Sequence, residues 1–325
     1  MKRIVFFVPS DKPVGGIAKV LDYAVHASMG GYDSIFCCKN INQDFASNPL
    51  FLKPYFKKNG GSIKIISINQ LEPLKSDIVF FTLPSNHSIL SRIYFKKLEP
   101  CERFIHLLQN TRVAGLQYDR GYSFRLLSKK LHRICITNEV LKSVEDYVLD
   151  KEILKLIPHG FDFDVFDKLP KKNDKVCILV NLFKGEFGLE VINYFKKDKR
   201  IKKINICKKG ISWENLIKKY RESSIFVSTP LPEEGLYLPG LEAMAAGNLV
   251  ITPDCYGNRF YCDFSKNSIK VNYQVLSEYI KAIDESINNW QGSSYIKRLE
   301  GYKKASELKL DNERELFIKY LNNWF

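Results

Sequence analysis

The first half of the chain alternates short apolar runs with amphipathic stretches. The apolar runs have the length of strands and are rich in Ile, Val and Phe; they cover residues 3–8, 34–38, 63–66, 77–82, 103–108 and 133–137. The stretches with helical spacing cover residues 17–30, 88–97, 123–131 and 139–149, and residues 40–61 are ambiguous between the two patterns. Alternating strands and helices predict a parallel sheet with right-handed crossovers.

A polar segment at residues 167–175, which carries Pro170, interrupts the alternation and is typical of a linker. The pattern then begins again, with strands predicted at 176–181, 204–207, 225–228 and 249–252 and helices at 185–197, 212–222, 239–246 and from about 273 onward. A chain of 325 residues also exceeds the usual size of one core. We therefore expect an α/β protein with two Rossmann-like domains facing each other across a cleft. The expected domains are residues 1–165 and 166–308, and residues 309–325 are expected to form a helix that packs back on the first domain.

The most informative segment, residues 229–254, joins a predicted strand to a helix and then to another strand. Pro239 suits the first helical position, and Gly247 is expected to end the helix. Free N–H groups at the beginning of such a helix suit a diphosphate, and Glu242, one turn into the helix, suits the hydroxyls of a ribose. The structural alternative is that the acids only complement the helix dipole, and we favour the binding role because the proline, the glycines and the following strand fit it too.

Glu234 and Glu242 are separated by seven residues in a segment that resembles the E-x7-E segment of retaining glycosyltransferases with the GT-B fold. The resemblance implies that Glu242 holds the nucleotide ribose. It also implies that Glu234 and the amides after it contact the donor sugar and phosphates, with Glu233 as an alternative to Glu234. The amides belong to Gly235, Leu236, Tyr237 and Leu238.

Other positions agree with the same resemblance. Gly15 and Gly16 follow the first strand, where the family has a glycine pair that lets backbone approach a ligand. His106 lies on a strand where the family often has a histidine facing the cleft; a sugar-binding and a structural role are equally open for it. Residues 157–162, with His159, resemble the segment that ends the first domain, and we expect that segment to be structural.

The chain departs from the family at the loop that should bind the diphosphate. The family has an Arg and a Lys after the first strand of the second domain, and here Asn181 replaces the Arg while Lys184 matches the Lys. Candidate replacements for the missing charge are Lys208, Lys209 and Arg259. Lys184 is also expected to stabilise the leaving diphosphate, so Glu234, His106 and Lys184 are the candidate catalytic residues.

The net charge of +14 indicates attraction to anionic partners but does not identify them. No apolar run is long enough to span a bilayer, so we expect a cytoplasmic protein that contacts an anionic membrane surface through basic residues of its first domain. Nucleic acid is not expected as a partner because no nucleic-acid-binding signature is present. The eight cysteines include no C-x-x-C pair and fit a reducing compartment.

The sequence therefore predicts a retaining glycosyltransferase that moves a sugar from a nucleotide-sugar donor to a glycan or lipid-linked glycan acceptor of the cell surface. It has no D-x-D pair in a predicted strand-end loop and no His/Cys cluster, so we expect catalysis without a metal or other cofactor. A nucleotide-sugar epimerase of the same fold and a non-catalytic sugar-nucleotide-binding protein remain the alternatives.

Overall fold

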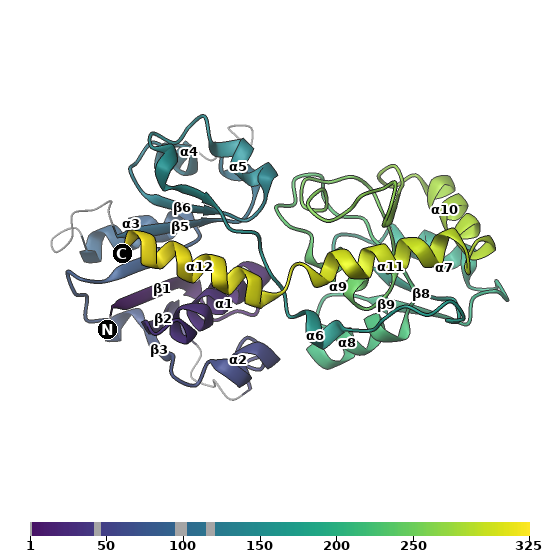
Figure 1. Cartoon of the computed structure of the whole chain (residues 1–325), viewed down its shortest axis with the longest axis horizontal. Helices are drawn as coiled ribbons and strands as arrows, with labels where there is room; N and C mark the ends of the chain where they lie inside the picture. Colours follow the sequence, from purple (N-terminus) through teal and green to yellow (C-terminus); the bar gives the residue numbers. More distant parts are fainter. Residues whose placement is uncertain (1, 42–46, 95–102, 115–120) are drawn as a thin grey trace. The chain divides into compact units, whose positions relative to one another are not determined.

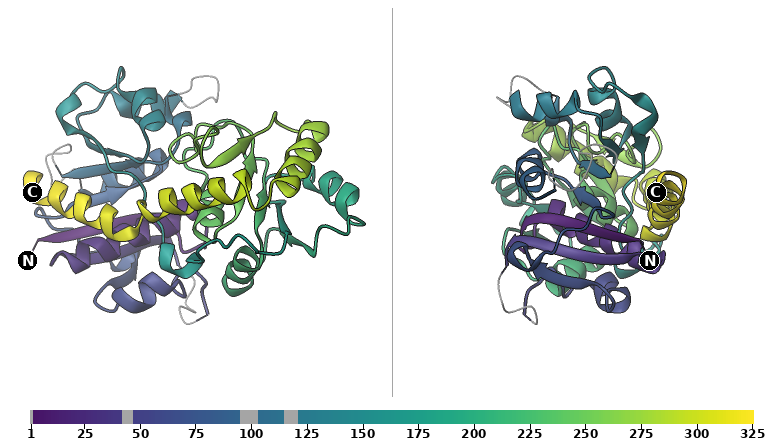
Figure 2. Two further views of the ribbon diagram at one scale, coloured as in Figure 1. Left: turned by 45° about the vertical axis from the view of Figure 1, so that its right-hand side comes forward. Right: turned by 90° about the vertical axis from the view of Figure 1, so that its left-hand side faces the viewer.

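The chain divides into two compact units, each built on a parallel sheet (Figures 1 and 2). The computed structural model describes residues 2–41, 47–94, 103–114 and 121–325. The first unit contains Met1–His159 and Asp311–Phe325, and the second contains Gly160–Leu310. The chain therefore passes between the units at 159/160 and 310/311. The boundaries expected from the sequence were 165/166 and 308/309.

The first unit has seven strands in the order β3-β2-β1-β4-β5-β6-β7, and all of their pairings are parallel. The strands are β1 (Arg3–Ser10), β2 (Asp33–Asn40), β3 (Lys64–Ser67), β4 (Ile78–Phe81), β5 (Phe104–Leu108), β6 (His132–Cys135) and β7 (Leu154–Leu156). The helices are α1 (Gly15–Met29), α2 (Pro54–Asn59), α3 (Pro84–Tyr94), α4 (Gly121–Leu127), α5 (Asn138–Val144) and α12 (Leu310–Trp324). Strands 3-2-1-4-5-6 follow the Rossmann order, which places β1 and β4 at the centre.

Alternate side chains of the central strands pack against different helices. Phe81 on β4 belongs to a cluster with Leu90 and Tyr94 of α3. Its neighbour Phe80 points to the other face, where its ring lies 5.1 Å from the ring of Tyr23 on α1 and 5.8 Å from that of Phe317 on α12. Because successive strand residues point to opposite faces, a strand covered on both sides must be apolar at nearly every position, and this explains the apolar runs.

A buried carboxylate fastens α12 to α1. Glu313 on α12 is an ion-pair partner of Lys19 and lies 3.1 Å from His26 Nε2 and 3.1 Å from His159 Nδ1. Burial alone would raise the pKa of Glu313, but the Lys19 charge and hydrogen bonds from the two histidines hold that pKa well below its ordinary value. The last helix is therefore attached to the first unit by charge as well as by the packing of Phe317.

The second unit has five parallel strands in the order β12-β11-β10-β8-β9. The strands are β8 (Cys177–Asn181), β9 (Lys203–Cys207), β10 (Ile225–Val227), β11 (Leu249–Thr252) and β12 (Ser268–Lys270). The helices are α6 (Phe163–Phe166), α7 (Gly188–Phe195), α8 (Trp213–Glu222), α9 (Leu238–Ala245), α10 (Leu276–Asn288) and α11 (Ser293–Ser306).

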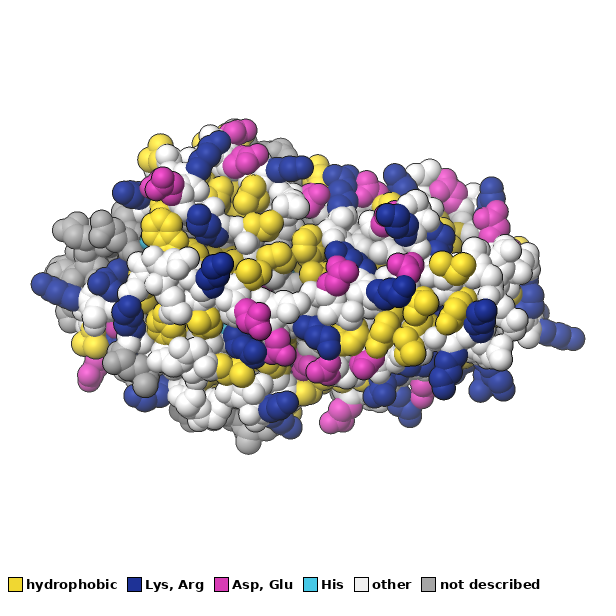
Figure 3. All heavy atoms as spheres, viewed as in Figure 1, with side chains coloured by type: hydrophobic (Ala, Val, Ile, Leu, Met, Phe, Trp, Pro, Cys, Tyr) yellow, Lys and Arg dark blue, Asp and Glu magenta, His cyan; other side chains and the backbone are white. Residues whose placement is uncertain are grey.

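Lysines and arginines are spread over both units, as the face in Figure 3 shows. The first unit has 25 cationic and 17 acidic residues, a net charge of +8, and the second has 25 and 19, a net charge of +6. Net charge per unit therefore does not distinguish the two. Among the described helices, none combines the length and the apolar character needed to cross a membrane.

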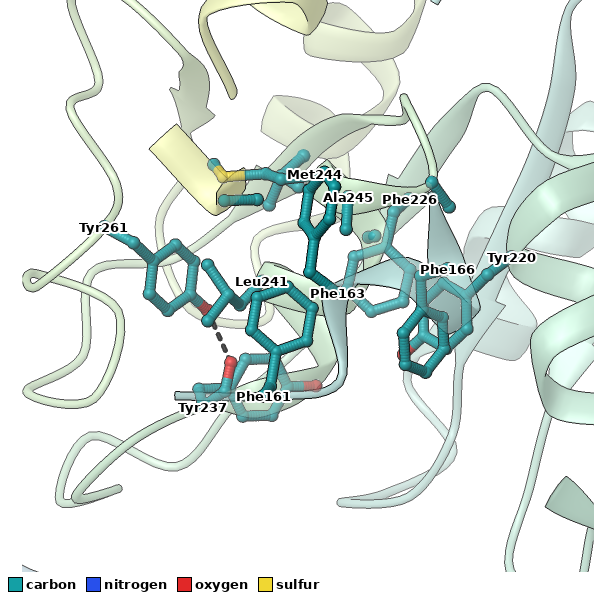
Figure 4. Close-up of a cluster of buried hydrophobic side chains, with 14 of the residues drawn as sticks. Phe161, Phe163, Phe166, Tyr220, Phe226, Tyr237, Leu241, Met244, Ala245 and Tyr261 are labelled. Carbon is teal, nitrogen blue, oxygen red and sulfur yellow. Dashed lines mark hydrogen bonds between the residues drawn. The ribbon is translucent and has the colours of Figure 1, made fainter. Parts of the chain in front are cut away.

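The core of the second unit lies on both faces of its sheet. On one face Leu179 and Phe226 pack with Tyr220 of α8 and with Leu241 and Met244 of α9, and Figure 4 shows this cluster. On the other face the alternate strand residues pack against α7 and α10, and the members of that cluster include Ile178, Val180, Ile225, Val227, Val191, Phe195, Tyr279 and Ile283. The strands expected at 176–181, 204–207, 225–228 and 249–252 correspond to β8, β9, β10 and β11.

Two strands and several helix ends differ from the predictions. β7 and β12 were not predicted, and residues 40–61 contain α2. The helices expected to reach residues 131 and 149 end earlier, at Leu127 and Val144. The helix expected over 88–97 begins earlier, at Pro84, and residues 95–97 lie outside the described residues.

We expect Glu313→Gln to destabilise the protein by about 3 kcal/mol, because it leaves the buried Lys19 ammonium without its carboxylate partner on α12. Urea denaturation would measure the change. Glu315→Gln, on the exposed side of the same helix, is the matched control and should change stability by less than about 0.5 kcal/mol. Equal effects of the two substitutions would show that the buried pair does not hold α12.

Stability should also fall as the pH is lowered from about 6.5 toward about 4. All five histidines of the chain belong to the first unit, and burial lowers the pKa of each: His26, His87 (to about 4), His106 (to about 3), His132 (to about 4) and His159 (to about 4). In this window the unfolded chain binds protons that the folded chain excludes, which costs up to about 1.4 kcal/mol per histidine and pH unit. Denaturation midpoints measured across this range should decrease, and constant midpoints would contradict the prediction.

Candidate functional site

The carboxyl edge of the second sheet brings together loops that follow β8, β10 and β11. In α/β proteins ligands bind at this edge of the sheet. Gly188 allows α7 to begin close to β8, because a Cβ at this position would come within 2.4 Å of Val180 Cγ1. The Leu182 N–H donates to the Cys207 carbonyl at 2.8 Å, which places the loop after β8 beside the end of β9.

Tyr237, in the loop before α9, is bonded to the two other loops. Its N–H donates to the Gly257 carbonyl at 3.0 Å, and its carbonyl accepts from Tyr261 Oη at 2.6 Å. Its hydroxyl accepts from Asn181 Nδ2 at 3.0 Å. Asn181 is itself oriented, because its Oδ1 accepts from the Phe183 N–H at 2.8 Å. The buried Tyr237 therefore holds the loops after β8, β10 and β11 in one arrangement.

An ion pair lies on these loops. Lys184 Nζ, from the loop after β8, is 2.6 Å from Glu234 Oε1, from the loop after β10. The lysine side chain is 37% exposed and the glutamate side chain 14%, so solvent still reaches the pair. The structure thus brings together two of the three residues that the sequence marked as catalytic.

The helix α9 begins directly after this loop and has Tyr237 as its N-cap, with no capping hydrogen bond from the side chain. A helix N-terminus offers N–H groups and a partial positive charge to an anion. Glu242 lies one turn into α9 and is half-buried. Burial and the nearby Glu242 charge raise the pKa of the buried Tyr220 hydroxyl well above its ordinary value. Glu242 thus lies close to Tyr220 of α8.

Gly235, Leu236 and Leu238 belong to the same loop and helix start as Glu234 and Tyr237. Gly235 is buried, whereas Leu236 and Leu238 are half-buried and pack against the core beneath α9. Together these residues connect the ion pair to the beginning of α9. The donor-binding segment that the sequence predicts is therefore one continuous loop and helix start.

The proposed replacements for the missing arginine differ in their surroundings. Lys208 and Lys209 are exposed in the loop after β9. Arg259 makes two hydrogen bonds of 2.8 Å to Asp254, and its guanidinium lies 4.8 Å from the ring centroid of Tyr256. The Arg259 charge is therefore already matched by a carboxylate.

Three candidate residues belong to the first unit. Gly15 and Gly16 begin α1 after the short loop that follows β1, and the Gly16 carbonyl accepts from Gln109 Nε2 at 3.1 Å. His106 is fully buried in β5; its ring stacks on Phe81 at 4.7 Å, and Nε2 lies 3.0 Å from the Thr82 carbonyl. These surroundings favour the structural alternative for His106, because its ring is fully buried, while its Nδ1 is left without a hydrogen-bond partner among the described residues.

The described residues contain no group of three His, Cys, Asp or Glu side chains that could hold a metal ion. One D-x-D pair, Asp162 and Asp164, lies at the beginning of α6, outside the predicted strand-end loops. Asp164 is bonded to Lys309 at 3.2 Å.

Sequence reasoning missed the residues that position the site. Tyr237 was expected only to offer an amide, Asn181 was regarded as a lost charge, and Gly257 and Tyr261 were not considered for this role. A Cβ at Gly257 would come within 2.8 Å of both the Glu234 carbonyl and the Tyr237 nitrogen. The Tyr256-Gly257 pair after a strand was the available signal, because glycine often marks a close backbone approach.

Gly257→Ala should therefore destabilise the second unit by about 1–3 kcal/mol, because backbone rather than a flexible side chain blocks the added methyl group. Gly61→Ala is the control, since no atom would lie within 4 Å of the added Cβ and its φ is not positive. Chemical denaturation of both variants would test this. Wild-type stability of Gly257→Ala would mean that the loop does not need this close contact.

No protein-family model and no curated protein sequence matches the chain. Solved structures do match. HepE from Anabaena, determined with UDP and glucose, aligns with a TM-score of 0.71 and 12% identity over 99% of this chain and 100% of that chain. Sucrose-phosphate synthase from Thermosynechococcus elongatus gives 0.66 and 14%, and a glycosyltransferase from Rickettsia africae gives 0.65 and 15%, both over 99% of each chain. The two parallel α/β units thus have the GT-B fold of these glycosyltransferases.

Proposed function

We propose that this protein transfers a sugar from a nucleotide-sugar donor to a glycan or lipid-linked glycan acceptor, with retention of configuration. One observation carries the proposal: the Lys184–Glu234 ion pair joins the loop after β8 to the loop that leads into the N-terminus of α9, with Glu242 one turn into that helix. The cation and the helix N-terminus suit the diphosphate of a sugar nucleotide, and the two carboxylates suit the hydroxyls of its sugar and its ribose.

The donor's diphosphate would be bound by Lys184 and by the amides before and at the beginning of α9. Glu242 would accept hydrogen bonds from the ribose hydroxyls, and Glu234 would accept them from the sugar. The neighbouring HepE structures contain UDP and UDP-glucose, which supports a donor of this class. Retention rests on the resemblance of Glu234–Glu242 to the E-x7-E segment.

Lys184 would have two partners in turn, first Glu234 and then the donor's diphosphate. In the structure described here Lys184 pairs with Glu234. With a donor bound, Lys184 would move to the diphosphate and Glu234 would be free to bond the sugar. As the glycosidic bond breaks, negative charge grows on the leaving diphosphate, and Lys184 and the loop amides would stabilise it.

We assign no nucleophile. The two-carboxylate mechanism of glycosidases needs acids on either side of the scissile bond, whereas Glu234 and Glu242 would lie along the length of the donor. His106 has no place in this proposal because it is fully buried beneath Thr82 and Phe81. No metal is needed for the charge on the diphosphate in this scheme.

Calorimetry with uridine, guanosine, adenosine and cytidine diphosphates, followed by turnover of the matching nucleotide sugars, tests the proposal. We expect one diphosphate to bind and its sugar nucleotide to be consumed in the presence of a chelator. Isomerised donor without acceptor would indicate the epimerase, and binding without any turnover would indicate the non-catalytic alternative. Inhibition by a chelator that manganese or magnesium reverses would contradict the metal-free scheme.

The two glutamates should affect different steps. Glu242→Ala should weaken diphosphate affinity by about tenfold to a hundredfold, because it removes charged hydrogen bonds worth about 1.5–3 kcal/mol. Glu234→Ala should keep diphosphate affinity, because Lys184 remains and loses its competing partner, while turnover falls more strongly. Glu233→Ala is the neighbouring control and should change both quantities little. Loss of diphosphate binding in Glu234→Ala with both properties intact in Glu242→Ala would reverse the assignment.

A further inference from the structure

The amino edge of the second sheet carries most of the chain's excess charge. Three segments enter the neighbouring strands β8, β9 and β10: residues 171–175, 196–203 and 218–222. Twelve of these 18 residues are Lys or Arg and three are acids, so they contribute +9 of the chain's net +14. We call these three segments the basic edge. Eleven of its twelve cationic side chains are exposed.

Hydrogen bonds show that the three segments are neighbours in space. The Lys202 N–H donates to the Val176 carbonyl at 2.8 Å, which joins the entries to β9 and β8. Ser224 Oγ donates to the Lys175 carbonyl at 3.1 Å, and Lys203 pairs with Glu222 at 2.8 Å. The cations therefore form one surface, at the sheet edge opposite the Lys184–Glu234 pair.

The acids of the basic edge do not neutralise this surface. Asp174 is bonded at 2.6 Å to Arg298, a buried side chain of α11 that is not part of the edge. Glu222 pairs with Lys203 and Lys218, and Asp198 with Arg200, which also contacts Asp284. Within the described chain, the other nine cations make no ion pair, and these are Lys171, Lys172, Lys175, Lys196, Lys197, Lys199, Lys202, Lys219 and Arg221.

Ordinary structural roles account for only part of these cations. Lys196, Lys197, Lys219 and Arg221 lie at the ends of α7 and α8, where cations complement the helix dipole. Residues 171–175 and 199–203 lie further beyond the nearest preceding helix end, so the helix dipole does not account for their cations. The basic edge is also too far away to attract a donor to the carboxyl edge of the same sheet. The five residues of β8 between the two edges span roughly 16 Å, about two Debye lengths at physiological salt, so the charges are screened over this distance.

Two features favour a lipid surface as the partner. The exposed apolar side chains of Leu169 and Tyr194, 56% and 58% exposed, flank the lysines in sequence, and Lys172 Nζ lies 5.7 Å from the ring centroid of Tyr295. Tyrosines and aliphatic side chains beside lysines suit a membrane interface, where the rings lie at the level of the headgroups. Ten of the twelve cations are lysines, which act as point charges on phosphates and lack the forked geometry that reads bases.

We propose that the basic edge binds the surface of a membrane rich in anionic phospholipid, so that the second unit, rather than the first as the sequence analysis expected, makes the membrane contact. The proposal does not depend on the proposed enzymatic function. Each lysine near an anionic surface contributes about 1 kcal/mol, and clusters of this size are sufficient for peripheral binding.

Co-sedimentation of the full chain with phosphatidylcholine vesicles, with and without phosphatidylglycerol, tests the proposal. We expect binding only to vesicles that contain phosphatidylglycerol, and release in high salt. The variant Lys197→Glu/Lys199→Glu/Lys202→Glu should bind these vesicles about a hundredfold more weakly, since three contributions of about 1 kcal/mol are lost and 1.4 kcal/mol is a factor of ten. All three side chains are exposed, so the fold and any nucleoside-diphosphate affinity should be unchanged.

Lys57→Glu/Lys58→Glu/Lys64→Glu makes the same charge change on exposed residues of the first unit and serves as the matched control. It should retain binding. The proposal is wrong if the control loses as much affinity as the edge variant, if the edge variant keeps its affinity, or if the wild type ignores phosphatidylglycerol. Salt-sensitive binding of a DNA or RNA duplex without vesicle binding would assign the edge to nucleic acid instead.

Discussion

One buried side chain and its peptide groups hold the carboxyl edge of the second sheet together. Tyr237 follows β10, and it is bonded to Asn181 at the end of β8 and to Gly257 and Tyr261 after β11. A loop fixed through its N–H, its carbonyl and its side chain cannot move without breaking several buried hydrogen bonds, and each unsatisfied group would cost about 1–3 kcal/mol. The placement of Lys184 and Glu234 on neighbouring loops depends on this connection, because an ion pair that solvent reaches contributes too little to fix loops by itself.

The bond to Tyr237 also explains the role of Asn181, which stands where the glycosyltransferase family that the sequence resembles has an arginine. Asn181 contributes no charge, but both ends of its amide are used, one on Tyr237 and one on the Phe183 N–H. Under the proposed function the site therefore relies on fewer cations and more on the N-terminus of α9. A diphosphate would compete with Glu234 for Lys184, so donor binding and release of Glu234 toward the sugar would be one coupled event.

Much of the fold could be predicted because parallel strands buried on both faces appear as continuous apolar runs, as in β1 and β8. β7 (Leu-Lys-Leu) and β12 (Ser-Ile-Lys) are short and interrupted by polar residues, whereas β10, equally short, was predicted because Ile-Phe-Val is a continuous apolar run. In the site, Glu234 and Glu242 could be found from their spacing, whereas the Asn181–Tyr237 bond joins residues 56 apart and follows only from the order β10-β8 in the sheet. The strand that carries His106 was predictable, but the depth of its ring was not, because burial depends on Phe81 of the neighbouring strand.

The first unit is also discontinuous in sequence, and the buried charge on α12 gives this a physical consequence. Lys19 and Glu313 are separated by 294 positions, with the whole second unit between them. Before α12 is in place, Lys19 has Asp22, at 3.7 Å, as its carboxylate partner but lacks Glu313, and Tyr23 and Phe80 lack the Phe317 ring that covers them. Burying this ammonium without Glu313 is costly, so we expect this face of α1 to close over its apolar core only when the last helix packs on it. The first unit therefore reaches its final packing only when α12, which follows residues 160–310 in the chain, packs against it. Its stability thus depends on a helix that lies beyond the second unit in the sequence.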